Sequence, residues 1–250
     1  MYIRIDNRKI HFKRVGHGPA ILFVHGWGGT VYSLHDVAQL ATAKYTTYTI
    51  DLPGFGKSDN PPPHWGVEGY ADLIALFLKK LNIKTPLYVG HSFGGAIGIY
   101  IASHNPELIS SLVLCDSSFK RASKVSTVAR IIKILPASVR PFFYPVEPII
   151  KKVYYRLFQR NSDLMKYPHL EQNFRKIVTQ DLTADTKKIH IPTLILWGED
   201  DTATPVLWAY ELEKNIAGSR LVVYPGVRHN LPLKRPDDVW GQIDAFSSEL

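Results

Sequence analysis

The sequence predicts an α/β fold built on a doubly wound, mostly parallel sheet. Short apolar segments alternate with segments of helical periodicity along most of its 250 residues, a pattern typical of helices that cover both faces of a parallel sheet. Segments such as 20–24 and 112–115 are continuously apolar, as strands buried on both faces are. Turn-forming polar sequences follow these segments, at the sheet edge where α/β folds bind their ligands.

Eight segments have the pattern expected of strands. The first two, 2–5 and 8–15, alternate polar and apolar residues as half-exposed antiparallel strands do. The others are the mainly apolar runs 20–24, 87–89, 112–115, 193–197 and 219–224 and the threonine-rich segment 46–50. Helices are expected at 32–43, 67–81, 94–103, 206–217 and 236–248.

Composition places the chain among ordinary globular proteins. With 45% hydrophobic residues, its length suits one α/β domain that carries an insertion. The amino terminus has no apolar signal region, and no run approaches the length of a membrane span. The single cysteine, Cys115, lies within an apolar run, so we expect a buried thiol and a cytoplasmic protein.

The segment 117–190 differs from the rest of the chain. It contains 15 Lys and Arg against 5 Asp and Glu, whereas the remaining residues contain 15 and 17. Prolines divide it into pieces of helical pattern at 121–134, 146–160 and 170–180. We interpret it as a helical cap (lid) on a core domain formed by 1–116 and 191–250. Its charge indicates either a solvated surface or a docking surface for an acidic carrier protein or an anionic membrane.

A tight turn after the fifth strand carries the first candidate catalytic residue. The run Leu87-Tyr88-Val89 ends in Gly90-His91-Ser92-Phe93-Gly94, and a helical pattern follows at once. Glycines on both sides of the serine permit a sharp strand-to-helix turn that exposes its hydroxyl. The amino end of the helix would also stabilise a developing oxyanion. This order indicates a nucleophilic serine.

Two further polar groups follow later strands. An acidic cluster occupies 199–201 after the strand 193–197, and His229 follows the last strand. A serine hydroxyl needs an imidazole base, and the imidazole needs a carboxylate that fixes its tautomer. The glycine-rich turn 25–29 follows the third strand, where its backbone N–H groups would bind an oxyanion.

Five motifs in this order resemble those of the α/β-hydrolase superfamily, most nearly its small-cap serine carboxylesterases. The motifs are His25-Gly26-Trp27-Gly28, Asp51-Leu52-Pro53-Gly54-Phe55-Gly56-Lys57-Ser58, Gly90-His91-Ser92-Phe93-Gly94-Gly95, Trp197-Gly198-Glu199-Asp200-Asp201 and Gly226-Val227-Arg228-His229. The resemblance implies an eight-stranded sheet with a helical cap after strand six. It implies that Ser92 is the nucleophile, His229 the base and Asp201 the acid, with the Trp27 and Phe93 amides as oxyanion hole.

Other residues are assigned less directly. Asp116 is a rival to Asp201, because some members of the superfamily carry the acid after the strand that precedes the cap. Gly26, His91, Phe119 and Phe143 are expected to line the substrate site. The reaction needs no metal or organic cofactor, and the sequence contains no cluster at metal-ligand spacing. The basic segment has no nucleic-acid motif.

The serine at the elbow narrows the chemistry that the resemblance implies. Haloalkane dehalogenases and epoxide hydrolases use aspartate there, so neither activity fits. Carbon–carbon bond hydrolases keep the serine, but Trp27-Gly28-Gly29 and Asn230 depart from their pattern. We expect hydrolysis of esters with small or medium acyl or aryl groups. The alternatives are a lactonase (for example of acyl-homoserine lactones), an esterase of carrier-protein-linked acyl esters, a carbon–carbon bond hydrolase in spite of these departures and, in another class, a slow-turnover ligand-binding protein.

Overall fold

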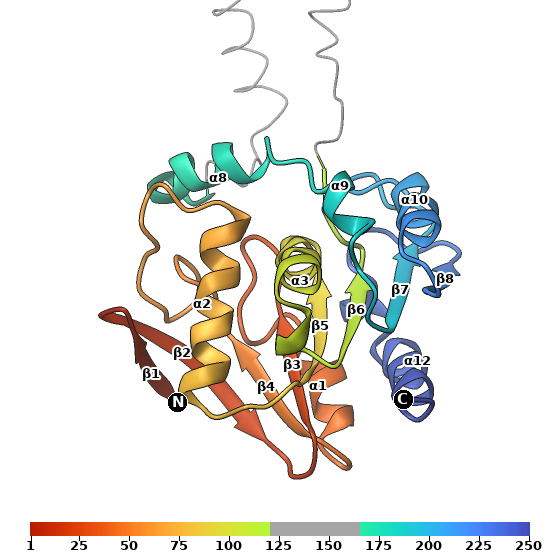
Figure 1. The fold of residues 1–250 in the computed structure, drawn as a ribbon, viewed down its shortest axis with the longest axis horizontal. Coiled ribbons are helices and arrows are strands. Elements are labelled where there is room, and N and C mark those ends of the chain that lie inside the picture. The colour runs from red at the N-terminus through yellow and green to blue at the C-terminus, as the bar shows by residue number, and fades with distance from the viewer. Residues whose placement is uncertain (121–165) are drawn as a thin grey trace, which may run out of the picture. The chain divides into compact units, whose positions relative to one another are not determined.

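The computed structural model describes residues 1–120 and 166–250. Its centre is an eight-stranded sheet with the strand order β1-β2-β4-β3-β5-β6-β7-β8 (Figure 1). The strands are β1 Tyr2–Ile5, β2 Arg8–Val15, β3 Ala20–Val24, β4 Thr46–Ile50, β5 Leu87–His91, β6 Ser111–Cys115, β7 Thr193–Gly198 and β8 Arg220–Tyr224.

The direction of the strands follows from their sequence patterns. The alternating strands β1 and β2 pair antiparallel, and β2 also pairs antiparallel with β4. From β4 to β8 every pairing is parallel. Every residue of β4, β5, β6 and β7 is buried, as continuous apolar runs require. The predicted doubly wound, mostly parallel eight-stranded sheet is thus confirmed.

The longer helices lie where the periodicity predicts them, with ends shifted by one to three residues. They are α1 His35–Ala41, α2 Val67–Lys80, α3 Phe93–His104, α10 Leu207–Asn215 and α12 Pro236–Ser247. The shorter ones are η1 Pro106–Leu108, η2 Pro168–Leu170, α8 Glu171–Ile177, α9 Thr183–Thr186 and α11 Leu231–Lys234. Within the described residues, no helix is both long and apolar enough to cross a lipid bilayer.

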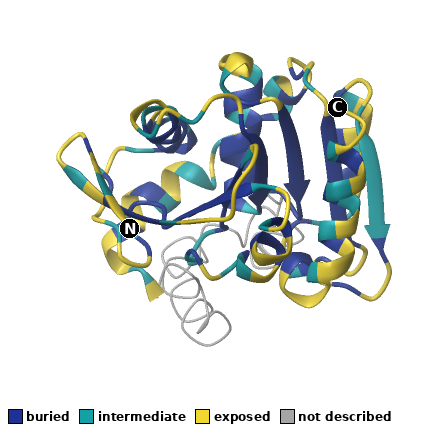
Figure 2. Ribbon diagram, turned by 90° about the horizontal axis from the view of Figure 1, so that it is seen from below, coloured by how far each residue is buried: buried dark blue, intermediate teal, exposed yellow. Residues whose placement is uncertain are grey.

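Helices cover both faces of the sheet. On one face, α1 and α12 pack on each other and enclose a core with alternate residues of the central strands, among them Phe23, Val89 and Leu196. On the other face, α2 and α3 pack side by side, with α3 against β5 and β6 and α2 on the side toward β1 (Figure 1). Figure 2 shows the central strands buried, whereas β8 at the sheet edge is mostly intermediate.

The chain forms two compact units. One comprises Met1–Arg121 with Gln172–Leu250 and contains the whole sheet, and the other is Ala122–Glu171. The helix α8 falls within the expected helical piece 170–180. The expected helices 121–134 and 146–160 lie wholly outside the described residues. The cap boundaries 117–190 therefore stay a prediction.

Candidate active site

Ser92 occupies a sharp turn between β5 and α3. Its backbone angles, φ 51° and ψ −113°, lie in a region that non-glycine residues rarely adopt. The turn closes only because its neighbours lack side chains: a Cβ on Gly90 would lie 2.5 Å from the Gly94 carbonyl oxygen, and one on Gly94 would lie 2.1 Å from the Val24 carbonyl oxygen. Both contacts are with backbone, which cannot rotate away.

We expect Gly94→Ala to lower the free energy of unfolding by about 3 kcal/mol or more, since β3 or the elbow must shift to admit the methyl group. Ester hydrolysis should fall as well, because the shift moves Ser92. Urea unfolding and initial rates measure the two effects. Gly241→Ala is the control: it lies inside α12 with nothing within 4 Å of the added Cβ, so helix propensity should stabilise it by about 1 kcal/mol. Equal stability of both variants would contradict the expectation.

The three residues expected to form a catalytic triad lie within hydrogen-bond distance of one another. Ser92 follows β5, Asp201 follows β7 and His229 follows β8, so all three sit at the carboxyl edge of the parallel strands. The Ser92 Oγ–H donates to Nε2 of His229 at 2.9 Å, and the Nδ1–H of His229 donates to Oδ2 of Asp201 at 2.7 Å. A hydroxyl, an imidazole and a carboxylate are thus joined in one chain.

The Asp201 carboxylate is held by four donors. Oδ1 accepts the backbone N–H groups of Ala203 (2.7 Å) and Thr204 (2.9 Å), and Oδ2 accepts the Thr204 hydroxyl at 2.6 Å besides the imidazole. Burial raises the pKa of Asp201, but the bonds from His229 and Thr204 outweigh it and hold this pKa below its usual value. Thr204 was not anticipated, although an Asp followed three residues later by Thr is a local hydrogen-bonding pattern.

Asp116, the rival acid, is hydrogen-bonded to other groups. It follows β6 and is fully buried, and its Oδ1 and Oδ2 accept the backbone N–H groups of Gly198 (2.9 Å) and Leu231 (3.1 Å). Burial raises its pKa to about 6. His91, expected to line the substrate site, is buried beside it and donates from Nε2 to the His229 carbonyl at 3.2 Å.

The turn 25–29 lies directly beside the serine, since a Cβ on Gly26 would sit 3.0 Å from the Ser92 Cβ. His25 secures this turn: its Nδ1–H donates to the Gly26 carbonyl at 2.7 Å, and its Nε2 accepts the Leu52 N–H at 3.0 Å. Among the described residues, the backbone N–H groups of Trp27 and Phe93 donate to no other group. Both amides therefore remain able to bind an oxyanion at Ser92.

Burial lowers the pKa of His25 to about 4, so the unfolded chain binds a proton between pH 6.5 and 4 that the folded protein does not. His25 therefore makes the protein less stable as the pH falls through this window. We expect His25→Gln to flatten the dependence of unfolding free energy on pH by up to about 1.4 kcal/mol per pH unit. Urea titrations of both proteins from pH 7.5 to 4.5 measure the slopes. Parallel curves would rule out a neutral His25.

An aromatic group surrounds the Trp27 side chain. Its ring centroid lies 5.0 Å from Phe55, 5.9 Å from Phe93 and 5.1 Å from Phe174 of α8. Phe174 carried no sequence signal that set it apart from other aromatic residues. Phe119 instead packs against Trp208 of α10, with centroids 5.6 Å apart, and Phe143 lies outside the described residues.

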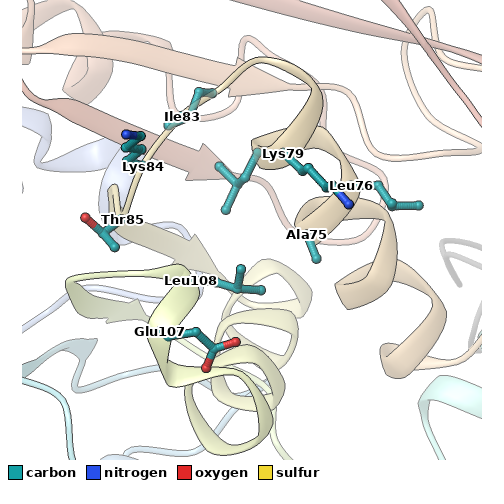
Figure 3. A pocket seen from close by; sticks show the side chains of 9 residues that line it. Ala75, Leu76, Lys79, Ile83, Lys84, Thr85, Glu107 and Leu108 are labelled. Atoms are coloured by element: carbon teal, nitrogen blue, oxygen red, sulfur yellow. The ribbon is translucent and has the colours of Figure 1, made fainter.

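A side-chain cluster and a pocket among the described residues also resemble binding sites. His91, Asp116 and His229 have potential metal ligands within 4.8 Å of one another, but the His91 Nε2 and both Asp116 oxygens already serve the hydrogen bonds given above. A pocket of 460 Å³ opens between the end of α2, residues 83–85 and η1 (Figure 3). Thr85 precedes β5 whereas Ser92 follows it, so this pocket lies at the opposite edge of the sheet and supplies nothing to the serine.

The chain is similar to several known proteins. The chain is 26% identical to YugF, an uncharacterised hydrolase of Bacillus subtilis (strain 168), over 94% of this chain and 92% of that protein. It is 22% identical to the pimeloyl-[acyl-carrier protein] methyl ester esterase of Vibrio vulnificus (strain YJ016), over 96% and 98%. The enol-lactonase from Burkholderia xenovorans LB400 superposes with a TM-score of 0.77 at 19% identity, over 99% and 100%.

The model of one protein family matches residues 21–242. This range takes in the elbow, the acid loop and the histidine loop, and it spans most of the chain. The resemblance read from the five motifs is thereby confirmed at the level of the superfamily. The chain belongs to the alpha/beta hydrolase family.

Proposed function

We propose that this hydrolase cleaves carboxylic esters through an acyl-serine intermediate. Ser92 is the nucleophile, His229 the general base and Asp201 the residue that orients the imidazole. The observation that carries the proposal is the continuous hydrogen-bonded chain from the Ser92 hydroxyl through His229 to Asp201, with separations of 2.9 and 2.7 Å. Such a chain activates a hydroxyl that is otherwise a poor nucleophile at neutral pH.

The reaction follows from these positions. The Ser92 oxygen attacks the ester carbonyl carbon while Nε2 of His229 takes its proton, and the carbonyl oxygen becomes an oxyanion beside the Trp27 and Phe93 amides. Collapse breaks the bond to the alcohol, which leaves with the proton from His229. Water then attacks the acyl-serine, giving its proton to His229. Collapse of the second tetrahedral intermediate breaks the bond to Ser92 and releases the acid, and the Ser92 oxygen takes the proton back from His229. Asp201 stays ionised and stabilises the imidazolium that forms twice in the cycle.

The substrate class that we propose is an ester with a small or medium acyl or aryl group. The side chain of Trp27, whose backbone amide is a proposed oxyanion donor, is in contact with three other aromatic rings. These are the rings of Phe55, Phe93 and Phe174. Apolar and aromatic walls with few polar groups are typical of small-molecule sites. Lactones contain the same reacting carbonyl and differ only in keeping the leaving alcohol attached.

The experiment is a panel of aryl esters of increasing acyl length, together with lactones, assayed with the native protein and with Ser92→Ala. We expect many turnovers per enzyme on short or medium esters, lost in the variant. Preference for the cyclic substrates would identify a lactonase. A single burst without further turnover would indicate the slow binding protein instead, and equal activity of Ser92→Ala would refute the proposal.

An ester linked to an acidic carrier protein is the second candidate. It is favoured by the excess of basic residues in 117–190 and by the name of the Vibrio relative. Attraction between such charges weakens with salt. KM for a carrier-linked ester should therefore rise with ionic strength and with charge reversal in 117–190, while KM for a free aryl ester stays constant. Unchanged KM values for the carrier-linked ester would reject this candidate.

A further inference from the structure

Two buried side chains hold the backbone of the two peptide units that follow the Cα of His229. The Nε2–H of His91, the last residue of β5, donates to the His229 carbonyl at 3.2 Å. Two residues further along, the Leu231 N–H donates to Oδ2 of Asp116, the residue after β6, at 3.1 Å. The two holding groups lie next to each other, with His91 Nε2 3.9 Å from Asp116 Oδ2. The loop that carries the base is thus fastened to two inner strands of the sheet.

Asp116 also fastens the loop that carries the acid. Its Oδ1 accepts the N–H of Gly198, the last residue of β7, at 2.9 Å, and its carbonyl oxygen accepts the Thr204 hydroxyl at 3.1 Å. The same hydroxyl lies 2.6 Å from Asp201. One residue therefore connects the strand before Asp201, the turn after it and the residue two positions beyond His229.

Asp116 occupies its place at a free-energy cost. Its φ of 45° is unusual for a residue with a side chain, and the carboxylate is fully buried, which disfavours its charged form. An apolar side chain would avoid the cost of the charge but would leave two backbone N–H groups without acceptors. The two N–H groups that need the carboxylate as acceptor are those of Gly198, before the acid loop, and Leu231, in the base loop.

We propose that Asp116, together with His91, is a positioning residue for the base: the pair keeps the His229 imidazole within reach of the Ser92 hydroxyl by holding the carbonyl of residue 229 and the N–H of residue 231. This inference rests on the proposed function and adds a role to it. Asp116 takes no proton from the imidazole, because the Nδ1–H of His229 is already donated to Asp201 and the Asp116 oxygens are occupied by amides.

Asp116→Asn is the main test. The substitution keeps the volume of the side chain but turns one acceptor oxygen into an N–H donor that faces a backbone N–H. We expect kcat for an aryl ester to fall about 10- to 100-fold with KM changed by less than about twofold, as a displacement of the base predicts. Labelling of Ser92 by a fluorophosphonate should slow in proportion. The far-downfield proton resonance of the hydrogen bond between His229 and Asp201 should broaden.

Two comparisons separate positioning from general stability. Thr186→Val removes a buried hydroxyl that donates to the Thr183 carbonyl and accepts from Asn215, and it should lower Tm while leaving kcat and the resonance unchanged. His91→Leu removes the donor to the His229 carbonyl and should lower kcat about 10-fold. His91→Gln, which keeps a donor, should restore most of that loss. The His91 pair also gives a result if Asp116→Asn does not fold.

The outcomes discriminate sharply. Wild-type kcat and an unchanged resonance in Asp116→Asn would overturn the proposal, as would equal rates for His91→Leu and His91→Gln. A loss in Asp116→Asn as large as that in Asp201→Ala would make Asp116 the acid and overturn it too. If the native protein neither hydrolyses esters nor reacts with the fluorophosphonate, the proposed function fails, while the resonance in Asp116→Asn still tests whether Asp116 positions His229.

Discussion

Ser92→Ala is expected to reduce kcat for ester hydrolysis on the order of 10⁶-fold, the scale at which a nucleophile in a working triad contributes. The reason is geometric as well as chemical. The hydroxyl is the atom that the imidazole contacts at 2.9 Å, and alanine offers nothing to attack the carbonyl. Rates on an aryl ester and the mass of the protein after fluorophosphonate treatment measure the effect, because only the native chain should gain the adduct.

Ser117→Ala is the matched control for this result. Ser117 is fully buried, and its Oγ has no hydrogen-bond partner in the part of the chain that the structure describes. Removing this hydroxyl costs no hydrogen bond, so activity and Tm should stay close to those of the native protein. If Ser92→Ala kept even a tenth of native turnover while Ser117→Ala lost it, the nucleophile would have to be reassigned.

Asp201→Ala is expected to lower kcat about 10⁴-fold, because the imidazole loses the partner that fixes its tautomer and stabilises its charged form. Asp116→Ala should lower kcat far less, on the order of the 10- to 100-fold loss expected for Asp116→Asn, and should also reduce Tm, since it leaves the Gly198 and Leu231 N–H groups unpaired. Steady-state kinetics and thermal unfolding of both variants give the comparison. The reverse order of kcat values would transfer the role of acid to Asp116.

The sheet was predictable from sequence because most central strands are short apolar runs that end in a glycine or polar turn. Residues buried on both faces of a parallel sheet are mostly apolar, so this pattern reports the structure directly. β4 has three threonines among its five residues, and its β-branched side chains predict a strand instead. Helix ends were less predictable. The turn before His35 is held by a long-range bond from the Val31 N–H to Oδ1 of Asp51, and the short helix α11 was missed because it follows His229 without any periodic run.

The candidate site, too, was predictable from the sequence only in part. Ser92 and His229 were identifiable because each stands in a distinctive motif after a strand. The acid was not unique, since Glu199, Asp200, Asp201 and Asp116 all follow strands. Only the three-dimensional arrangement shows Asp201 on the imidazole and Asp116 on two amides. Thr204 was missed although its bonds to Asp201 are local. Phe174 contacts Trp27 from a segment far away in the chain, and no local pattern reports such a contact.

The strand that precedes His229 lies at the margin of the sheet. β8 pairs with β7 alone and four of its five residues are only partly buried, whereas the strands before Ser92 and Asp201 are fully enclosed. Local opening favours such margins over the interior. On warming, β8 should therefore open before the central strands unfold and displace His229, so that activity is lost at a lower temperature than the fold. Amide hydrogen exchange should accordingly be faster in β8 than in β5 and β7.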